Sequence, residues 1–505
     1  MKSMNADADL FDRQRLPPAV DEFLRETNPW WAGRPGPLLP AYRRAAFEQA
    51  FKRLRGGLAP VTVIRGPRQV GKTTLQLQLI EHLLTHEKLE PRRILRIQFD
   101  ELPSLRGLDE PILAVARWFQ NRVLGETFNE AARAGRPAFL FLDEVQNLAD
   151  WAPQVKSLVD HHTLRMLVTG SSALRIEAGR DSLAGRIAPI ELGTLLVREI
   201  AGLRFGEELP PLLPENGLQA LLRPEFWRDL QQWGVTNRSA RDRAFAAFSE
   251  RGGYPMAHNR PDVPWPEVAD QLNETVIQRA IQHDLRIGQR GLKRDRQLLE
   301  EVFRLACRYA GQSPGRAIFI QEIRQALGAN IGWQRILAYL NFLDGAMLLK
   351  LVRPLELRLK RRKGNLKLCV CDHGLRAAWL QEVIPLAAEA LASSPHLHDL
   401  AGHLAESVTG YFLGGLPHLD VAHFPERGAE PEIDYVLTIG ERRIPLEVKY
   451  RQQIDGHRDT LALRAFLEKS VYNAPFGVLV TMGDDMRVSD PRIVCVSLPS
   501  LLLMR

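Results

Sequence analysis

Long apolar runs are missing from this chain of 505 residues. The longest, such as residues 138–142, fall far short of the roughly 20 residues that cross a bilayer. The stretch MKSMNADADLFDRQ at residues 1–14 carries acids where a signal peptide needs an apolar core. We therefore expect a soluble, cytoplasmic protein with no membrane partner.

Cysteines are also scarce, and the charge imbalance is small. The four cysteines, Cys307, Cys369, Cys371 and Cys495, are too few for a secreted chain of this length held by disulfides. No second Cys pair or Cys/His spacing completes a zinc site around Cys369 and Cys371, so we expect reduced core cysteines. The 67 Lys and Arg against 60 Asp and Glu give a net charge of +7, which permits nucleic-acid binding without demonstrating it.

A phosphate-binding loop is predicted directly after residues 61–65. The β-branched run VTVIR favours a buried strand, LQLQLIEHLL favours a helix, and GPRQVGKTT between them fits G-x-x-x-x-G-K-[ST]. Backbone N–H groups of such a loop and the helix N-terminus bind phosphate, Lys72 reaches the β and γ phosphates, and Thr73 ligates Mg²⁺. The expected ATP-binding residues are Gly66, Pro67, Arg68, Gln69, Val70, Gly71, Lys72, Thr73 and Thr74.

A second acidic motif supports this site. The apolar run FLFL ends in Asp143 and Glu144, as a Walker B segment does. We expect Asp143 to hold Mg²⁺ and Glu144 to polarise the attacking water, which makes the protein an ATPase with ATP and Mg²⁺ as cofactors. Strands predicted at 94–99, 164–169 and 187–192 complete the sheet. Ser171 and Ser172 follow one of them and are interpreted either as a sensor of the γ phosphate or as a helix cap.

These motifs resemble the AAA+ superfamily of P-loop ATPases. More narrowly, the chain is similar to prokaryotic ATPases that join this core to a winged helix and a C-terminal restriction-endonuclease-like domain. The matching pieces are NPWW at 28–31, GPRQVGKTT at 66–74, LDEVQ at 142–146, TGSSA at 169–173, SLAGR at 182–186 and GGYP at 252–255. The resemblance implies that Arg186 is a catalytic arginine finger, acting in cis or from a neighbouring subunit of a homo-oligomer. The alternative is a salt-bridged surface arginine.

The resemblance and the patterns together predict an α/β protein of several domains. We expect an N-terminal segment at 1–55, an AAA+ ATPase core with a parallel sheet at 56–200 and a helical lid at 201–290. A winged helix-turn-helix is expected at 291–380 and a PD-(D/E)xK nuclease-like α/β domain at 381–505. The GGYP segment is interpreted as a turn rather than a site.

A basic run gives the winged helix its predicted partner. Residues 350–367 contain one acid, Glu356, and many basic side chains. Such a wing can track the phosphates of DNA. The alternative is a protein-interaction module with a solvated charge run. The basic residues are Lys350, Arg353, Arg358, Lys360, Arg361, Arg362, Lys363 and Lys367.

A second chemical site is predicted on a hairpin near the C-terminus. Residues 432–437 and 444–449 read as two strands turned by Gly440, and they carry Asp434, Glu447 and Lys449 in the pattern D-x12-E-x-K. Alternation places Glu447 and Lys449 on one face, and the hairpin brings Asp434 beside them. Two carboxylates can share Mg²⁺ with a phosphate, while the lysine helps to activate water.

This pattern resembles the PD-(D/E)xK nuclease core. The resemblance implies catalytic roles for Asp434, Glu447 and Lys449, and a metal set of Glu406, Asp434 and Glu447, with Glu406 supplied by the preceding helix. The expected function is an ATP-regulated, metal-dependent nuclease. One alternative is an ATP-dependent DNA-binding switch or regulator with an inactive nuclease fold. Another is an ATP-driven protein-remodelling factor with a protein partner.

Overall fold

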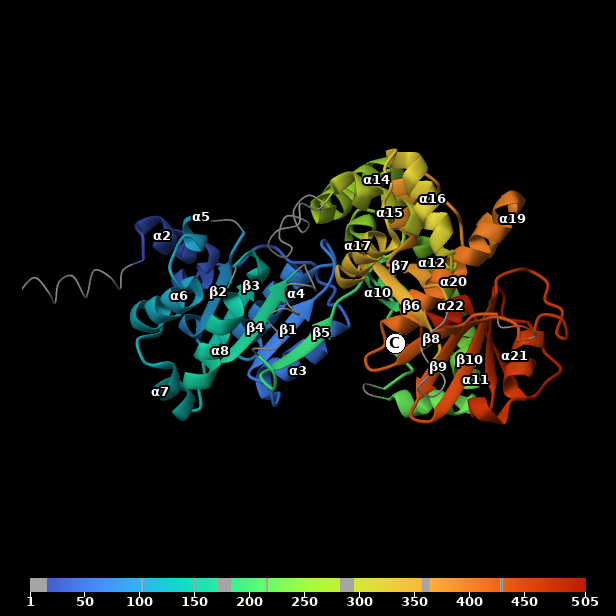
Figure 1. Cartoon of the computed structure of the whole chain (residues 1–505). Helices are drawn as coiled ribbons and strands as arrows, with labels where there is room; N and C mark the ends of the chain where they lie inside the picture. Colours follow the sequence, from blue (N-terminus) through green and yellow to red (C-terminus); the bar gives the residue numbers. More distant parts are fainter. Residues whose placement is uncertain are drawn as a thin grey trace, which may run out of the picture. The chain divides into compact units, whose positions relative to one another are not determined.

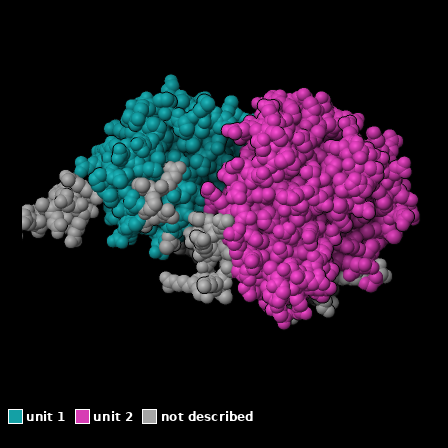
Figure 2. Space-filling model, turned by 90° about the horizontal axis from the view of Figure 1, so that it is seen from above, with its two compact units in different colours: residues 1–67, 71–192 teal, residues 68–70, 193–505 magenta. Residues whose placement is uncertain are grey.

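The computed structural model describes residues 16–100, 103–148, 150–170, 183–214, 217–281, 295–356, 364–426, 428 and 430–505. The chain divides into two compact units (Figure 2). The first consists of residues 1–67 and 71–192, and the second of residues 68–70 and 193–505. The described residues form two sheets, the first within residues 61–191 and the second within residues 349–497.

The first sheet is parallel and five-stranded, in the order β2-β3-β4-β1-β5 (Figure 1). Its strands are β1 (Val61–Arg65), β2 (Ile94–Gln98), β3 (Phe139–Asp143), β4 (Arg165–Gly170) and β5 (Ile187–Glu191). The strands predicted at 94–99, 164–169 and 187–192 are therefore confirmed to within one residue at each end. Because the strands are parallel, their carboxyl ends lie at one edge of the sheet, where the loops after β1, β3 and β4 begin.

Helices cover this sheet and complete the core of the first unit. Leu140 and Val168 of the sheet share a buried cluster with Val20, Ile112 and Val155 from three helices. The described helices are α2 (Pro18–Thr27), α3 (Ala46–Gly56), α4 (Lys72–Thr85), α5 (Pro103–Arg106), α6 (Pro111–Phe119), α7 (Phe128–Arg133) and α8 (Trp151–His161). Shorter helical turns are η1 (Pro29–Ala32), η2 (Pro91–Arg93), η3 (Gln120–Leu124) and η4 (Val145–Asn147).

The second sheet is mixed and seven-stranded, in the order β12-β11-β10-β9-β8-β6-β7. Its strands are β6 (Leu349–Pro354), β7 (Lys367–Val370), β8 (Asp420–Phe424), β9 (Ile433–Ile439), β10 (Arg442–Lys449), β11 (Gly477–Thr481) and β12 (Ile493–Ser497). β9 and β10 form the predicted hairpin, with Gly440 at φ 60° in its turn. β6 and β7 pair antiparallel, and β6 also pairs with β8. The predicted wing strands thus belong to the same sheet as the hairpin acids.

Two apolar clusters enclose this sheet. Trp227, Phe412 and Val480 belong to the larger cluster, and Phe466 and Leu479 to the smaller one. The neighbouring strand residues Leu479 and Val480 contribute to different clusters because successive side chains point to opposite faces.

The described helices of the second unit are α10 (Val197–Phe205), α11 (Pro224–Thr236), α12 (Arg238–Arg251), α13 (Pro255–Asn259), α14 (Trp265–Leu272), α15 (Arg296–Arg308), α16 (Arg316–Leu327), α17 (Trp333–Gly345), α18 (His373–Leu380), α19 (Ala388–Ala392), α20 (His398–Gly414), α21 (Leu461–Leu467) and α22 (Leu498–Leu501). Shorter turns are η5 (Leu218–Leu222), η6 (Asn273–Gln278), η9 (Pro395–Leu397) and η10 (Ser470–Tyr472).

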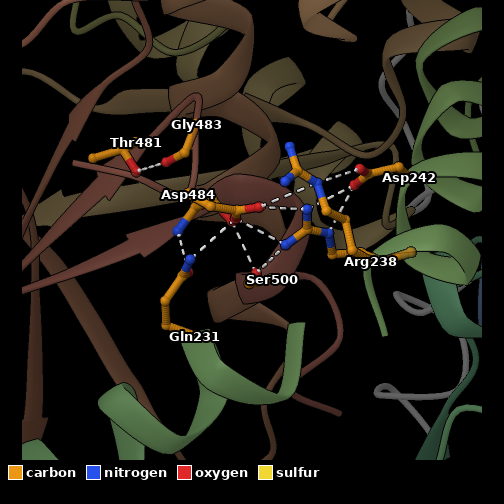
Figure 3. A network of polar contacts seen from close by, with 9 residues as sticks. Gln231, Arg238, Asp242, Thr481, Gly483, Asp484 and Ser500 are labelled. Carbon is orange, nitrogen blue, oxygen red and sulfur yellow. Dashed lines mark hydrogen bonds and ion pairs between the residues drawn. The ribbon is translucent and has the colours of Figure 1, made fainter. Parts of the chain in front are cut away.

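Helices α11 and α12 pack against the C-terminal end of the chain. Arg241 of α12 donates to both carboxylate oxygens of Asp484, at 2.8 and 2.7 Å, and to Ser500 of α22 at 2.8 Å. Figure 3 shows Asp484 with Gln231 of α11 and Ser500 beside it, and Arg238 of α12 close by. The compact unit 193–505 thus contains the segments that the sequence predicts as lid, winged helix and nuclease-like domain; their separation stays a prediction.

The structure also describes the four cysteines and the GGYP segment. All four cysteines are free thiols, three of them buried. Gly252 and Gly253 of GGYP lie in a bend before α13, where the backbone N–H of Gly253 donates to Asp372 at 2.5 Å. Within the described chain, the helices are too short or too polar to span a membrane.

Candidate functional sites

The predicted phosphate loop joins β1 to α4, as the motif requires. Gly71 lies at φ 93°, a conformation that suits glycine, and it begins α4. Lys72 is buried, and its ammonium donates to the carbonyls of Gly66 and Pro67 at 3.0 and 2.7 Å. The loop therefore holds its lysine at the N-terminus of a helix, where an anion is favoured.

Asp143, at the end of β3, connects this loop to the sheet. The hydroxyl of Thr73 donates to Asp143 Oδ2 at 2.9 Å. Asp143 is fully buried and accepts further hydrogen bonds from Thr169 of β4 and, at 3.3 Å, from Arg96 of β2. The two residues that the sequence assigns to Mg²⁺, Thr73 and Asp143, are thus in contact. Their hydroxyl and carboxylate oxygens suit a hard divalent cation.

Glu144 leaves the strand in an unusual conformation. Its φ is 54°, in the left-handed region, so that the backbone leaves the extended conformation of β3 at this residue. Its backbone N–H donates to the hydroxyl of Thr169 at 3.4 Å, and its carboxylate accepts from Gln146. The Thr169 hydroxyl thus contacts both acids, through the carboxylate of Asp143 and the backbone of Glu144.

Sequence reasoning missed two residues of this site. Thr169 and Arg96 both contact Asp143, whereas the predicted sensors Ser171 and Ser172 lie outside the described residues. Arg96 also contacts Gln76 of α4 at 3.0 Å. The parallel strand pairing could have identified Thr169, because it ends β4 next to the end of β3.

Arg186 is bound to the same chain. Its guanidinium donates to both carboxylate oxygens of Asp160 on α8, at 2.5 and 3.1 Å. The Arg186 side chain is about one-third exposed, and this bidentate hydrogen bond lowers the pKa of Asp160. The contact matches the salt-bridged alternative of the sequence prediction, while the arginine-finger role stays a prediction.

The second predicted site brings its acids together. Glu406 lies on α20, Asp434 on β9, and Glu447 and Lys449 on β10. Lys449 donates to Glu447 Oε1 at 2.5 Å. The backbone N–H of Val448 donates to Asp434 Oδ2 at 2.9 Å, and that of Asp434 points to Glu447 Oε2 at 3.4 Å.

Lys367 joins this cluster and corrects a sequence interpretation. The sequence places Lys367 in a basic wing that contacts DNA phosphates or, in the alternative, in a solvated charge run, but Lys367 is only 1% exposed. Its ammonium lies 2.6 Å from Asp434 Oδ1 and 2.7 Å from Glu406 Oε2. The interpretation is wrong because β7, the edge strand of this sheet, is covered by α20, and its first residue, Lys367, pairs with the acids.

The surroundings shift the pKa values of these acids in opposite directions. Burial and then the Asp434 carboxylate raise the pKa of Glu447 to about 8 and also raise the pKa of Glu406. Burial opposes ionisation of Asp434 as well, but the Lys367 ammonium and the Val448 N–H lower its pKa. Burial also disfavours the charge on Lys367, yet Asp434 and Glu406 raise its pKa above the usual range. Lys367 and Asp434 therefore form a charged pair.

The residues present do not fit the predicted metal set. Glu406, Asp434 and Glu447 each direct one oxygen at a lysine ammonium. The second oxygen of Asp434 accepts from the backbone. Across the residues that the structure describes, no group of three or more His, Cys, Asp and Glu side chains is arranged to hold a metal ion. Divalent cations need several free oxygen ligands, which this arrangement does not offer.

The rest of the predicted wing is described only in part. Arg353 is exposed and Lys350 half-buried on β6. Arg358, Lys360, Arg361, Arg362 and Lys363 lie outside the described residues.

The first site defines a P-loop nucleotide-binding domain, and comparison with known proteins narrows the class. Residues 59–201 match the family described as AAA domain. Residues 226–383 match a domain of unknown function, DUF8612. This second match runs from α11 to beyond α18 and thus crosses the predicted boundaries of lid and winged helix.

Curated relatives match over short stretches. An uncharacterized protein of Mycobacterium tuberculosis is 31% identical over 158 residues, which cover 30% of this chain and 29% of that protein. One of Methanocaldococcus jannaschii is 29% identical over 134 residues, 26% of each chain. The matched part thus spans less than a third of these relatives' length.

Solved structures share only distant similarity. The Aeropyrum pernix ORC1 protein in complex with DNA matches with a TM-score of 0.27 and 12% identity, over 72% of this chain and 95% of that one. A structure on katanin self-assembly matches with a TM-score of 0.21 and 18% identity, over 38% and 57%. At such low scores neither similarity adds to the assignment.

Proposed function

We propose that the first unit binds and hydrolyses ATP. The contact between Thr73 and Asp143 carries this proposal, because it brings the end of the phosphate loop to the acid of the neighbouring motif. Lys72 would exchange its loop carbonyls for the β and γ phosphates. Thr73 and Asp143 would hold Mg²⁺, which neutralises phosphate charge when it is bound. Glu144, whose backbone leaves the strand at φ 54°, would orient and deprotonate the attacking water.

Two substitutions test the proposal. Lys72→Ala should lose nucleotide binding, and Glu144→Gln should bind ATP without hydrolysing it. Matched controls are Lys156→Ala and Glu81→Gln, which change exposed residues of α8 and α4 in the same unit. Binding is measured with a fluorescent ATP analogue, and turnover by phosphate release. Unchanged turnover in both test variants would contradict the proposal.

The second unit is proposed to be directed at DNA. The basic residues of 350–363 support this partner, and the succession α15, α16, α17, β6 and β7 supports the predicted winged helix. Removing charge at Lys360, Arg361, Arg362 and Lys363 should weaken DNA binding for all sequences. It should also flatten the salt dependence, because each lost phosphate contact lowers the slope by nearly one. Fluorescence anisotropy at several salt concentrations measures both, and an unchanged slope would remove this segment from the DNA site.

Two activities remain for the nuclease-like part of this unit. Cleavage is supported by the hairpin that presents Asp434, Glu447 and Lys449. The lysine contacts of Glu406 and Asp434 instead favour the DNA-binding switch with an inactive nuclease fold. Plasmid incubation with Mg²⁺ or Mn²⁺, with and without ATP, separates the two. Nicking that disappears in Asp434→Ala would establish the nuclease.

A further inference from the structure

The ammonium group of Lys367 occupies the centre of the acidic cluster. It lies 2.7 Å from Glu406 and 2.6 Å from Asp434, and 5.0 Å from the ring centre of Tyr435. These partners come from α20, which packs against β7, and from β9, which is separated from β7 in the sheet by β8 and β6. A buried ammonium is costly unless it is paired, so Lys367 depends on these two carboxylates.

The same geometry leaves little room for a second cation. A divalent ion held by Glu406 and Asp434 would lie against Lys367, and like charges repel strongly in a buried site. It would also compete for oxygens that already accept from Lys367 and from the backbone of Val448. The nearby Glu447 has its own ammonium partner in Lys449.

We propose that the Lys367 ammonium is the cation that neutralises Glu406 and Asp434, and that it excludes divalent metal ions from these two carboxylates. The ion pairs of Lys367 thereby link β7 to α20 and β9, in addition to the packing of β7 against α20. This inference rests on the likeness of the second unit to a nuclease core, and it is independent of ATP hydrolysis in the first unit.

Calorimetric titration of nucleotide-free protein with Mn²⁺ tests the proposal. Lys367→Met should gain one Mn²⁺ site that the wild type lacks, and Lys367→Met/Asp434→Asn should lose it again. Arg376→Met is the matched control, because Arg376 is also a buried cation and it pairs with a carboxylate outside this cluster, that of Glu382. It should gain no site. Weak Mn²⁺ binding at the phosphate loop contributes equally to all variants, so that it does not affect the difference between them.

Two results would overturn the inference. One is Mn²⁺ binding by the wild type that Asp434→Asn abolishes. The other is a folded Lys367→Met protein that gains no site. If Lys367→Met alone does not fold, the comparison of wild type with Asp434→Asn still decides whether the wild type binds Mn²⁺ through Asp434. The variant Lys367→Met/Glu406→Gln/Asp434→Asn should then recover stability over Lys367→Met, because no buried charge is left unpaired. Neither result affects the proposals for ATP turnover or DNA binding, which have separate tests.

Discussion

Asn28 forms two hydrogen bonds with the backbone of Arg96, as a neighbouring strand would. Its side-chain amide donates to the Arg96 carbonyl at 2.9 Å and accepts from the Arg96 N–H at 2.7 Å. β2 is the edge strand of the first sheet, so these groups would otherwise lack a strand partner. The adjacent Trp30 and Trp31 donate to the carbonyl of Ile94 on the same edge. The NPWW segment thus holds β2, and with it the Arg96 side chain that contacts Asp143.

Asn28→Ala should destabilise the first unit. Asn28 is fully buried, and its loss leaves two backbone groups of Arg96 unpaired, at a cost of about 1–3 kcal/mol for each such group. Urea unfolding monitored by tryptophan fluorescence measures the change. Thr27→Ala is the control, because the Thr27 hydroxyl donates to carbonyls of its own helix and accepts from the Asn28 amide at 3.4 Å, but makes no hydrogen bond to β2. Equal effects of both substitutions would show that the Asn28 contacts do not stabilise the strand edge.

Thr169→Val should slow ATP turnover without unfolding the domain. The substitution keeps the shape of Thr169 but removes the hydroxyl that donates to Asp143. Loss of a contact that orients a metal-binding carboxylate lowers metal affinity or activity by roughly 10–100-fold. Phosphate release at varied Mg²⁺ concentration measures the effect. Thr62→Val is the matched control, since Thr62 is equally buried on the neighbouring β1. A normal Mg²⁺ dependence in Thr169→Val would exclude the role.

The two sites differ in how far the sequence could predict them. The phosphate loop and Asp143 lie within short contiguous motifs, and strand–loop–helix geometry follows from those motifs directly. Thr169 was not predicted because its role depends on which strands are adjacent. Lys367 was assigned to a wing because its neighbours in sequence are basic, whereas its partner Asp434 lies 67 residues further along the chain. The composition of the neighbouring residues does not show which distant residue Lys367 pairs with.

For the helices between the two predicted chemical sites, too, the sequence indicates the local structure but not the tertiary contacts. Residues 201–290 have amphipathic helical patterns, which predict helices but not the surface they cover. The structure packs α11 against β12, and Gln231 donates to Asp484 from 253 residues away. The helices were therefore predicted correctly as helices, but their packing on the C-terminal sheet was not.

Asp372 should make stability depend on pH. Burial raises its pKa to about 7, although the N–H groups of Gly253 and Leu375 donate to it. The folded state therefore holds a proton more tightly than the unfolded state does. The stabilisation is complete below the ordinary value of 3.8 and is lost as pH rises through 7. Unfolding midpoints between pH 5 and 8 measure this, with Asp372→Asn as reference. Parallel pH profiles of the two proteins would contradict the assignment.

Arg241→Met should destabilise the second unit strongly. Arg241 and Asp484 form a buried bidentate pair, and loss of one partner leaves an unpaired buried charge, worth about 3–5 kcal/mol. Arg238, in the same network, provides the control (Figure 3). Its side chain is 65% exposed and 3.9 Å from Asp484, so that Arg238→Met should cost no more than about 1 kcal/mol. Denaturant unfolding compares the two, and similar costs would mean that burial does not govern the strength of the pair.

Arg186 and Asp160 allow the arginine finger to be separated from a structural salt bridge. Both residues contribute to the salt bridge, but only Arg186 could stabilise charge on a phosphate. If Arg186 is a finger, Arg186→Ala should lose turnover by about 10³-fold or more while Asp160→Asn keeps it. If the pair is structural, both variants should lose similar stability and keep turnover.

Mixing experiments then determine where the arginine acts. A finger supplied by a neighbouring subunit predicts that activity per chain rises with protein concentration. It also predicts that Arg186→Ala chains inhibit wild-type chains in a mixture, because each altered chain disables its neighbour's site. A finger in cis predicts activity strictly proportional to the wild-type fraction. Phosphate release across mixing ratios measures this, and mixtures of wild-type with Lys156→Ala chains, which keep turnover, provide the control for mixing itself. Full turnover in Arg186→Ala, and hence activity that does not change with the mixing ratio, would support only the salt bridge of this residue to Asp160.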